Sequence, residues 1–434
     1  MWGCLTVKRM LLGVFLLAAV GSVSAETDHP VLPGFDEAVT TLRAIPAVVT
    51  ALDHVVTLEP ESHAILIELN EIEAPPFSEG KRAARYVELM EEAGLEKVYI
   101  DEVGNAIGVR PGRSGDRMVA VVAHLDTVFP AGTDVTVKER DGKLYAPGIG
   151  DNTRGLVTGL TMLRAMQHAN LETDADIWFV GNVGEEGLGD LRGVKHLFRA
   201  GAEKIDAMIA IDGGESTRIV YGGVGSHRYR VTFKGPGGHS WSAFGLANPH
   251  HALGRAIAIF DENATAVTSV GPKTSYNIGR IGGGTSINSI PFESWAEIDM
   301  RSGEQAKIDE IDAVLQAAIQ QALAEENAGR LSGDALTVDI EQVGKRPAAK
   351  GDTRQALVQR AIAATKAFGF TPEMQLSSTD SNIPISLGIP AVTMSRGGVG
   401  GGAHSLDEWW QNKDGHLGIQ IALITLLLEA GLVQ

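Results

Sequence analysis

The sequence predicts an α/β protein in which a largely parallel sheet is sandwiched by helices and interrupted by an inserted α+β domain. Residues 118–123 form an unbroken apolar run, as expected for a strand buried on both faces of a parallel sheet. Strand-like and helix-like segments then alternate up to residue 211, which indicates βαβ units. After about Gly222 the order becomes β-α-β-β-α-β, which is the split-βαβ, ferredoxin-like unit.

The composition is that of a soluble globular protein. With 434 residues, the chain is long enough for two domains and a substantial core. A hydrophobic share of 44% and a charged share of 21% exclude a disordered or fibrous chain. The net charge of −17 disfavours binding to nucleic acid and to anionic lipid, so we expect no nucleic-acid partner.

The first 25 residues have the form of a secretory signal peptide. A basic pair precedes an apolar run at residues 10–20, and small residues lead to a cleavage site after Ala25. A cysteine that carries a lipid anchor would stand directly after such an apolar run. The only cysteine, Cys4, lies before the run, so it is not a lipid-bearing cysteine of this kind. The apolar runs at 10–20 and 421–428 are too short for a stable membrane span. We expect a periplasmic or secreted protein, with an uncleaved anchor as the alternative.

The α/β domain that the insertion interrupts, called the host domain below, is expected in two parts, at residues 26–222 and 346–434. Before the central strand, helical spacing covers residues 34–56, 59–69 and 79–93, and short strands are expected at 97–100 and 106–109. After it, helices at 153–168 and 191–200 alternate with strands at 176–183 and 205–211. The second part contributes a helix at 353–368, a strand at 390–394 and a final helix.

The inserted domain is expected at residues 223–345. Strands are expected at 226–234, 275–281, 293–301 and 335–343, with helices at 249–260 and 305–327. The candidate site would then be assembled from both parts of the host.

His124 and Asp126 follow the central strand directly. Side chains two residues apart on an extended segment point the same way, so both would emerge at the carboxyl end of the strand, where open α/β sheets bind ligands. Taken alone, this pair is more simply explained as a chance combination at a strand end. Its meaning depends on partners elsewhere in the chain.

Four further segments supply such partners. Asp151 lies in a glycine-rich turn before a helix, where it would otherwise be an N-cap. Glu185 and Glu186 follow a hydrophobic strand and repel each other unless cations compensate, although a solvated loop is the alternative. Asp212 ends an apolar run, and His404 lies in a second glycine-rich turn. Together these oxygen and nitrogen donors suit a zinc-type pair of ions.

Seven motifs in this order resemble the M20 family of dinuclear metallopeptidases and deacylases: HLDTVFP, GIGDNTRG, GNVGEEGLGD, IDGG, GPGGHS, GGTSINSIP and GGAHS. The family includes peptidase T-like aminopeptidases, carnosinase-like dipeptidases, glutamate carboxypeptidases, and acetylornithine and succinyl-diaminopimelate deacylases. The resemblance covers essentially the whole chain after residue 25. It implies a zinc peptidase-like host domain and an inserted dimerisation domain, and therefore a homodimer.

The resemblance implies two divalent metal ions per subunit, zinc in the first place, with cobalt or manganese as alternatives. Asp151 would bridge the ions. The other implied ligands are His124 and Asp212 for one ion and Glu186 and His404 for the second. Glu185 would be the general base that takes a proton from the metal-activated water, and Asp126 would hold the imidazole of His124.

The resemblance also implies roles for three residues of the inserted domain. His239 would reach the partner subunit's site and stabilise the oxyanion, although by itself it would be taken as a surface-loop histidine. Asn288 and Arg301 match positions associated with binding polar groups of the substrate. These assignments predict a site that two subunits share.

Two positions bear on the substrate. Asn152 follows the bridging acid where many family members carry Asp or Glu. Asp212 is the choice that tends to accompany aminopeptidases and dipeptidases rather than carboxypeptidases and deacylases. We therefore expect hydrolysis of small peptides near a free amino terminus. An N-acyl amino acid deacylase or carboxypeptidase is the alternative within the family, and a catalytically silent secreted binding protein is the alternative of another class.

Overall fold

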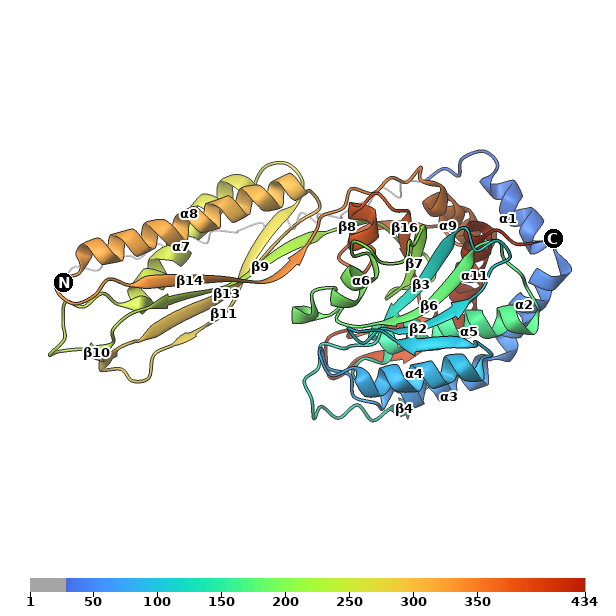
Figure 1. Cartoon of the computed structure of the whole chain (residues 1–434), viewed down its shortest axis with the longest axis horizontal. Helices are drawn as coiled ribbons and strands as arrows, with labels where there is room; N and C mark the ends of the chain where they lie inside the picture. Colours follow the sequence, from blue (N-terminus) through green and yellow to red (C-terminus); the bar gives the residue numbers. More distant parts are fainter. Residues whose placement is uncertain (1–28, 434) are drawn as a thin grey trace, which may run out of the picture.

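The computed structural model describes residues 29–433, and the predicted signal peptide lies outside them. Two units lie side by side along the longest axis of the molecule (Figure 1). One is built around a large sheet from both ends of the chain, and the other is an elongated unit formed by the middle of the chain. The α/β architecture with an inserted α+β unit is confirmed.

The host sheet has eight strands with a parallel centre. Their order is β1 (Lys97–Ile100), β2 (Ala106–Arg110), β6 (Asp176–Asn182), β3 (Met118–His124), β7 (Ala207–Ile211), β16 (Ala391–Met394), β8 (Arg218–Gly223) and β15 (Glu373–Ser377). The four central strands from β6 to β16 are parallel, whereas β2 runs antiparallel to β6 and β8 runs antiparallel to β16. The sheet is thus mixed at its flanks.

Helices cover both faces because the central strand is apolar on both. Val119, Val121 and Ala123 pack into one core, and Ala120 and Val122 pack into the other. The helices of the first face are α1 (Phe35–Arg43), α2 (Pro46–Thr57), α3 (Glu59–Asn70), α4 (Gly80–Glu92), α5 (Arg154–His168), α9 (Ala356–Ala367) and α11 (Gly415–Ala430). The second face is covered by α6 (Arg192–Leu197) and α10 (Asn382–Ser386).

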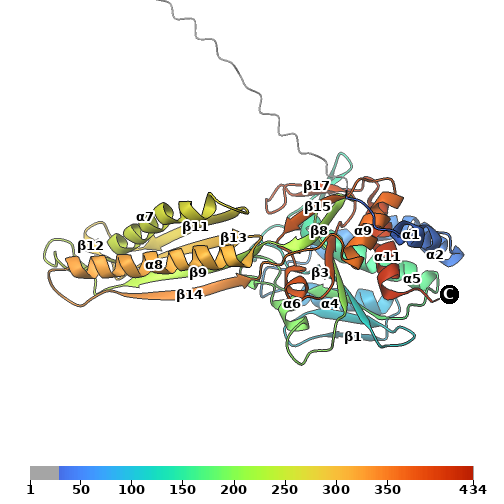
Figure 2. The same ribbon diagram turned by 90° about the horizontal axis from the view of Figure 1, so that it is seen from above.

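The inserted unit is a four-stranded antiparallel sheet with two long helices on one face (Figure 2). Its elements are β9 (Gly225–Lys234), α7 (Pro249–Thr268), β11 (Thr274–Gly283), β13 (Glu293–Ser302), α8 (Gln305–Gly329) and β14 (Thr337–Arg346). The strand order β11-β13-β9-β14 is that of the ferredoxin-like unit. A two-stranded ribbon of β10 (Gly238–His239) and β12 (Ser289–Ile290) lies at the end remote from the host (Figure 1).

Three local features differ from the expectation. The helix expected at 34–56 is two helices, α1 and α2, joined at a 77° bend, because Ile45 precedes Pro46 and is held in an extended conformation. Strands β8 and β15, which were not expected, extend the host sheet at one edge. A second small sheet, not expected, has the order β17 (Val399–Gly401), β18 (Trp409–Gln411), β5 (Lys143–Tyr145) and β4 (Lys138–Arg140).

Within residues 29–433, no single helix has the length and apolar character needed to cross a membrane. Among these described residues, only the bent pair α1 and α2, taken together, meets that test of length and composition.

Candidate metal centre

The predicted ligands lie where the central strands of the host sheet end. His124 is the last residue of β3, Asp212 directly follows β7, and Glu185 and Glu186 follow β6 after two intervening residues. Because β3 pairs in parallel with both β6 and β7, their carboxyl ends meet at one edge of the sheet. A cavity of about 630 Å³ opens there, lined by residues of both units.

Asp151 lies between two histidines that come from distant parts of the chain. It lies in the segment Ile149–Thr153 that leads into α5, at a point where the main chain is not helical. Its Oδ1 is 3.2 Å from Nε2 of His124, and its Oδ2 is 3.3 Å from Nε2 of His404. Each carboxylate oxygen therefore faces a different imidazole, as a ligand that bridges two cations must.

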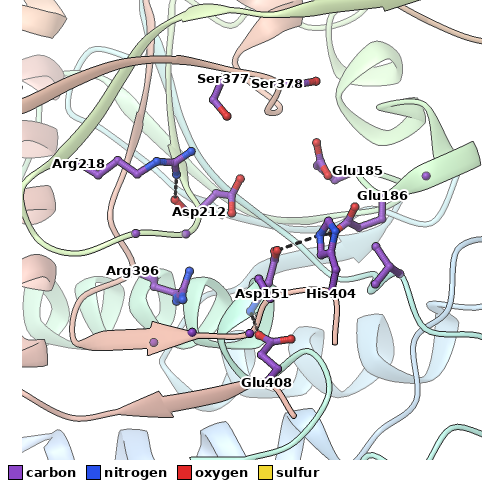
Figure 3. Close-up of a pocket in the computed structure, with 18 of the residues that line it drawn as sticks. Asp151, Glu185, Glu186, Asp212, Arg218, Ser377, Ser378, Arg396, His404 and Glu408 are labelled. Atoms are coloured by element: carbon purple, nitrogen blue, oxygen red, sulfur yellow. Dashed lines mark hydrogen bonds and ion pairs between the residues drawn. The ribbon is translucent and has the colours of Figure 1, made fainter. Parts of the chain in front are cut away.

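Two groups of donor atoms share Asp151. In one, donor atoms of His124, Asp151 and Asp212 lie within 4.8 Å of one another, and in the other the donors belong to Asp151, Glu186 and His404. Nε2 of His404 is also 3.0 Å from Oε1 of Glu186, and Figure 3 shows these side chains converging on one side of the cavity. Imidazole nitrogens with carboxylate oxygens suit zinc and related divalent ions, so the residues present fit a metal pair.

The electrostatics of the cluster are those of a cation site. Burial raises the pKa of Asp212, and the charge of Asp151 raises it further. Burial also opposes ionisation of Asp151, but hydrogen bonds from His124 and His404 hold its pKa well below the usual value. The hydrogen bond between His404 and Asp151, together with a second between His404 and Glu186, raises the pKa of His404 to about 10. Without metal ions, the histidines thus compensate a surplus of negative charge.

Asp126 supports the site through both its main chain and its side chain. Its carbonyl oxygen is 3.0 Å from Nδ1 of His124, and its carboxylate oxygen is 3.7 Å from the same nitrogen. The carboxylate accepts the main-chain N–H groups of Glu185 at 3.0 Å and Glu186 at 2.8 Å. Asp126 was predicted to hold the imidazole of His124 through its carboxylate, but the nearer oxygen is that of its main-chain carbonyl. The carboxylate instead fixes the turn that carries Glu185 and Glu186.

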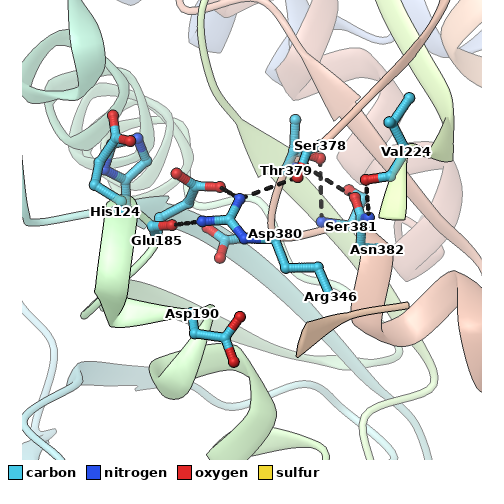
Figure 4. A network of polar contacts seen from close by, with 12 residues as sticks. His124, Glu185, Asp190, Val224, Arg346, Ser378, Thr379, Asp380, Ser381 and Asn382 are labelled. Carbon is cyan, nitrogen blue, oxygen red and sulfur yellow. Dashed lines mark hydrogen bonds and ion pairs between the residues drawn. The ribbon is translucent and has the colours of Figure 1, made fainter. Parts of the chain in front are cut away.

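Glu185 has a partner that the sequence did not predict. Arg346, at the end of β14, donates from Nη1 to Oε1 of Glu185 at 2.8 Å, and its Nη2 donates to the Glu185 carbonyl (Figure 4). Burial raises the pKa of Glu185 well above its usual value, whereas the Arg346 guanidinium opposes this shift. Glu185 and Glu186 therefore diverge: one contacts an arginine and the other a histidine.

Two further buried carboxyl groups adjoin the cluster. Oδ2 of Asp380 accepts from Nδ2 of Asn182 at 2.8 Å, and burial raises the pKa of Asp380 to about 7. Glu408 accepts three main-chain N–H groups of the turn that carries Asp151. Sequence analysis missed both residues. Asp380 does not lie in a glycine-rich turn, so no local pattern marks it, whereas Glu408 lies only four residues after His404 and its proximity to a proposed ligand could have indicated it.

The residues predicted in the inserted domain divide into two sets. Arg301 lines the cavity within the same chain. His239 lies in β10 and Asn288 directly precedes β12, at the tip remote from the host (Figure 1). The imidazole of His239 is exposed, and its Nδ1 lies 3.2 Å from the main-chain nitrogen of Trp241. A single chain therefore does not bring His239 and Asn288 to the metal centre.

Solved structures of similar architecture include peptidases and amidases. Aminopeptidase PepT from Bacillus cereus matches with a TM-score of 0.66 and 21% identity, over 84% of this chain and 97% of its own. Human carnosine dipeptidase 1 matches with a TM-score of 0.67 and 15% identity, over 88% of this chain and 99% of its own. At these identities the likeness establishes the fold alone.

Curated relatives are similar over shorter stretches. A putative LysW-lysine/LysW-ornithine hydrolase from Thermococcus kodakarensis is 36% identical over 137 residues, which cover 32% of this chain and 36% of that protein. The chain thus spans about a third of the length of the first such relatives that it matches. The uncharacterized protein YqjE from Bacillus subtilis is 25% identical over 300 residues, 68% of this chain and 76% of its own.

The family assignment rests on a match over most of the chain. The sequence model of peptidase family M20/M25/M40 matches residues 120–429, which include the end of β3, the inserted unit and the turn of His404. The match agrees with the resemblance of the seven motifs. The chain therefore belongs to peptidase family M20/M25/M40, a family of hydrolases.

Proposed function

We propose that the protein hydrolyses an amide bond of a small peptide with the help of two divalent metal ions. The observation that carries this proposal is the position of Asp151, whose two carboxylate oxygens face His124 and His404 separately. His124 and Asp212 would hold one ion, Glu186 and His404 the other, and Asp151 both. Such a pair, when bound, lowers the pKa of a shared water and polarises the carbonyl of the substrate.

The residues of the chain then position and move a proton. Glu185 accepts a proton from the attacking water and delivers it to the leaving nitrogen, as a general base that becomes a general acid. Arg346 holds its carboxylate at one oxygen and leaves the other oxygen for the water. Asp126 fixes the main chain of Glu185 and Glu186, so that one side chain serves the proton and the other serves the metal.

Exchange of Glu185 for Gln tests this assignment. Glu185→Gln removes the proton acceptor but none of the five proposed ligands, so turnover should fall about 100-fold or more while two metal ions per chain remain bound. Peptide hydrolysis and metal content are measured on the same samples, with Glu139→Gln, an exposed residue of β4, as the matched control. Full activity in Glu185→Gln would contradict the assigned base.

The finer proposal is a di- or tripeptide aminopeptidase that uses zinc. It rests on Asp212, the ligand type associated with aminopeptidases and dipeptidases in the resemblance. Comparing free peptides with N-blocked peptides distinguishes this activity from N-acyl amino acid deacylation or carboxypeptidase action. Metal-loaded protein that is inert toward all of these substrates would favour the silent binding protein.

Assembly and location complete the proposal. The edge strand β11 of the inserted unit is largely exposed, and this supports a homodimer formed through that unit. The apolar run at residues 10–20 supports export to the periplasm or to the medium. Determining the first residue of the exported protein tests the location, because a mature chain that keeps residues 1–25 would contradict cleavage after Ala25.

A further inference from the structure

We propose, on the basis of the proposed function, that Arg396 and Arg218 form an anion subsite for a carboxylate on the acyl side of the scissile amide. The preferred substrates would then be peptides with an acidic residue before the cleaved bond, such as glutamyl and aspartyl peptides. Neither arginine belongs to the motifs or to the ligand set described above.

Arg396 is a buried guanidinium without a hydrogen-bonding partner. It follows β16, lines the cavity and is only 7% exposed. Its Nε is buried without an acceptor, and within residues 29–433 no hydrogen bond or ion pair engages its guanidinium. Buried charged groups are expected to be paired, so an unpaired arginine that faces a cavity indicates a missing anion.

Other arginines of the cavity show the contrast. Arg346 donates to Glu185, and Arg228 and Arg301 both donate to Asp299. These guanidinium groups are already engaged by carboxylates of the chain. Among the described residues, Arg396 and Arg218 are the cavity arginines that form no ion pair with a carboxylate, so they can receive a carboxylate of the substrate.

The main chain approaches the Arg396 guanidinium closely at two glycines. A Cβ atom added at Gly150 would lie 2.8 Å from its Nη2, and one added at Gly400 would lie 2.9 Å from the same nitrogen. A Cβ atom at either position would displace the end of the Arg396 side chain, so glycine leaves room for the guanidinium at this place. Burial restricts the Arg396 side chain, which reduces the entropy lost when an anion binds.

Arg218 brings a second positive charge to the same place. A Cβ atom added at Gly213 would lie 3.1 Å from Nη1 of Arg218 and 3.4 Å from Nη1 of Arg396. Nη1 of Arg218 also donates to the Asp212 carbonyl at 2.7 Å, which fixes the side chain (Figure 3). Asp212 is a charge neighbour of both guanidinium groups, but its carboxylate is a proposed metal ligand. Once a metal ion takes up that carboxylate, a further anion would balance the two arginines, and a carboxylate with its two oxygens matches that requirement.

The charge of the loaded site favours the same substrate class. The cavity lining contains six carboxylates and five guanidinium groups, and Asp299, which binds Arg228 and Arg301, adds a seventh carboxylate. With neutral histidine this is a surplus of two negative charges, and two divalent ions, which add four positive charges, leave a net charge of two positive units. An anionic substrate would therefore be attracted rather than repelled.

The position of the base assigns the anion to the acyl side. Figure 3 shows Arg218 and Arg396 beside Asp212, whereas Glu185 lies across the cavity. Because Glu185 delivers its proton to the leaving nitrogen, the leaving group must lie on the Glu185 side. The acyl part then extends toward the arginines.

The decisive experiment compares isosteric substrates on the full-length, metal-loaded protein. We expect kcat/KM for Glu-Ala to exceed that for Gln-Ala by about tenfold or more, because a charge-assisted contact is replaced by a neutral one. Arg396→Gln should remove this preference, so that the ratio of kcat/KM for Glu-Ala to that for Gln-Ala approaches one. Arg199→Gln, an exposed arginine of the host domain outside the cavity lining, is the matched control.

Binding provides a readout that does not depend on turnover. Calorimetry with glutarate and with its monoamide on metal-loaded wild-type protein should show about tenfold or more tighter binding of the dianion. The difference should disappear in Arg396→Gln while the metal content is unchanged. The wild-type comparison remains informative even if the variant does not fold.

Several outcomes would overturn the proposal. Equal hydrolysis of Glu-Ala and Gln-Ala by active wild-type protein would refute the anion subsite and leave the proposed function intact. A uniform loss of activity on both substrates in Arg396→Gln would show that Arg396 serves only as a counter-ion of Asp151 and Asp212. Absence of hydrolysis of any amide would refute the proposed function, whereas the glutarate comparison would still decide the subsite.

Discussion

At the scale of single residues, Glu408 shows how a side chain outside the ligand set can control the metal centre. It accepts the N–H of Gly148 at 2.9 Å, of Gly150 at 2.9 Å and of Asp151 at 2.8 Å. Burial raises the pKa of Glu408 to about 7, and these hydrogen bonds oppose that shift. The carboxylate thus organises the main chain that presents the bridging ligand.

Glu408→Gln should weaken metal binding without removing a ligand. The amide can present only one oxygen, so at least one N–H of the turn would face an NH₂ group. We expect the affinity for metal to fall about 10- to 100-fold, as for other groups that orient ligands. Competition with a chelator measures this affinity, with Glu215→Gln, an exposed residue of the cavity rim, as control. Unchanged metal affinity in Glu408→Gln would contradict a positioning role.

The residues found from sequence were those marked by strand ends and glycine turns. His124, Asp151, Glu186, Asp212 and His404 stand at such places, and the structure brings them together. Arg346, Asp380 and Arg396 depend on contacts between segments far apart in the chain. Their surroundings are set by packing between β14, the host sheet and the turn of Asp151, which no local sequence pattern records.

At the scale of elements, α5 approaches the end of β7 because a glycine allows it. A Cβ atom added at Gly155 would lie 2.2 Å from Oδ1 of Asn152 and 2.7 Å from the Ile211 carbonyl oxygen. Nδ2 of Asn152 donates to that carbonyl at 2.8 Å, which ties the turn of Asp151 to the strand that leads to Asp212. The first turn of α5 therefore sets the spacing between two of the proposed ligands.

Gly155→Ala should reduce stability, although alanine favours helices. The added methyl group meets main-chain and buried polar atoms, so we expect the free energy of unfolding to fall by about 1–3 kcal/mol. Gly254→Ala in α7 is the matched control, because a Cβ atom there meets nothing within 4 Å. That control should gain up to about 1 kcal/mol. Thermal unfolding of both variants decides, and equal effects would contradict the packing argument.

The elements also show which parts of the fold a pattern can predict. Long apolar or alternating segments such as β3, β9 and α8 were expected at nearly their observed positions. The break between α1 and α2 and the three-residue strands of the small sheet were not. Short strands such as β5 are defined by their partners rather than by their own residues, and a single residue before Pro46 is enough to divide a helix.

At the scale of the whole molecule, His239 and Asn288 remain apart from the metal centre of their own chain. Both lie at the far tip of the inserted unit (Figure 1), whereas Arg301 and Arg346 of the same unit reach the host. If the unit mediates a homodimer, the tip of one subunit is available to the cavity of the other.

Mixing two inactive variants tests a site shared between subunits. His239→Ala lacks the donor for the oxyanion and Glu185→Gln lacks the base, so each homodimer should be nearly inactive. A heterodimer contains one site with both defects and one with neither, so subunit exchange should restore activity. Hydrolysis is measured against mixing time, with heterodimer formation followed by a tag on one variant. Demonstrated heterodimers without recovery would rule out the shared site.

The inserted unit joins the host through two neighbouring crossings. Gly223 and Ala349 exchange main-chain hydrogen bonds of 2.8 and 3.0 Å, so the exit and re-entry points of the chain are direct neighbours. Topologically the unit is an appendage, and its excision would leave ends that a tight turn can close. Yet Arg346, which holds Glu185, lies on the excised segment. The chain of the host domain could thus be joined without the inserted unit. The proposed general base, Glu185, would then lose Arg346, the residue of the inserted unit that holds its carboxylate.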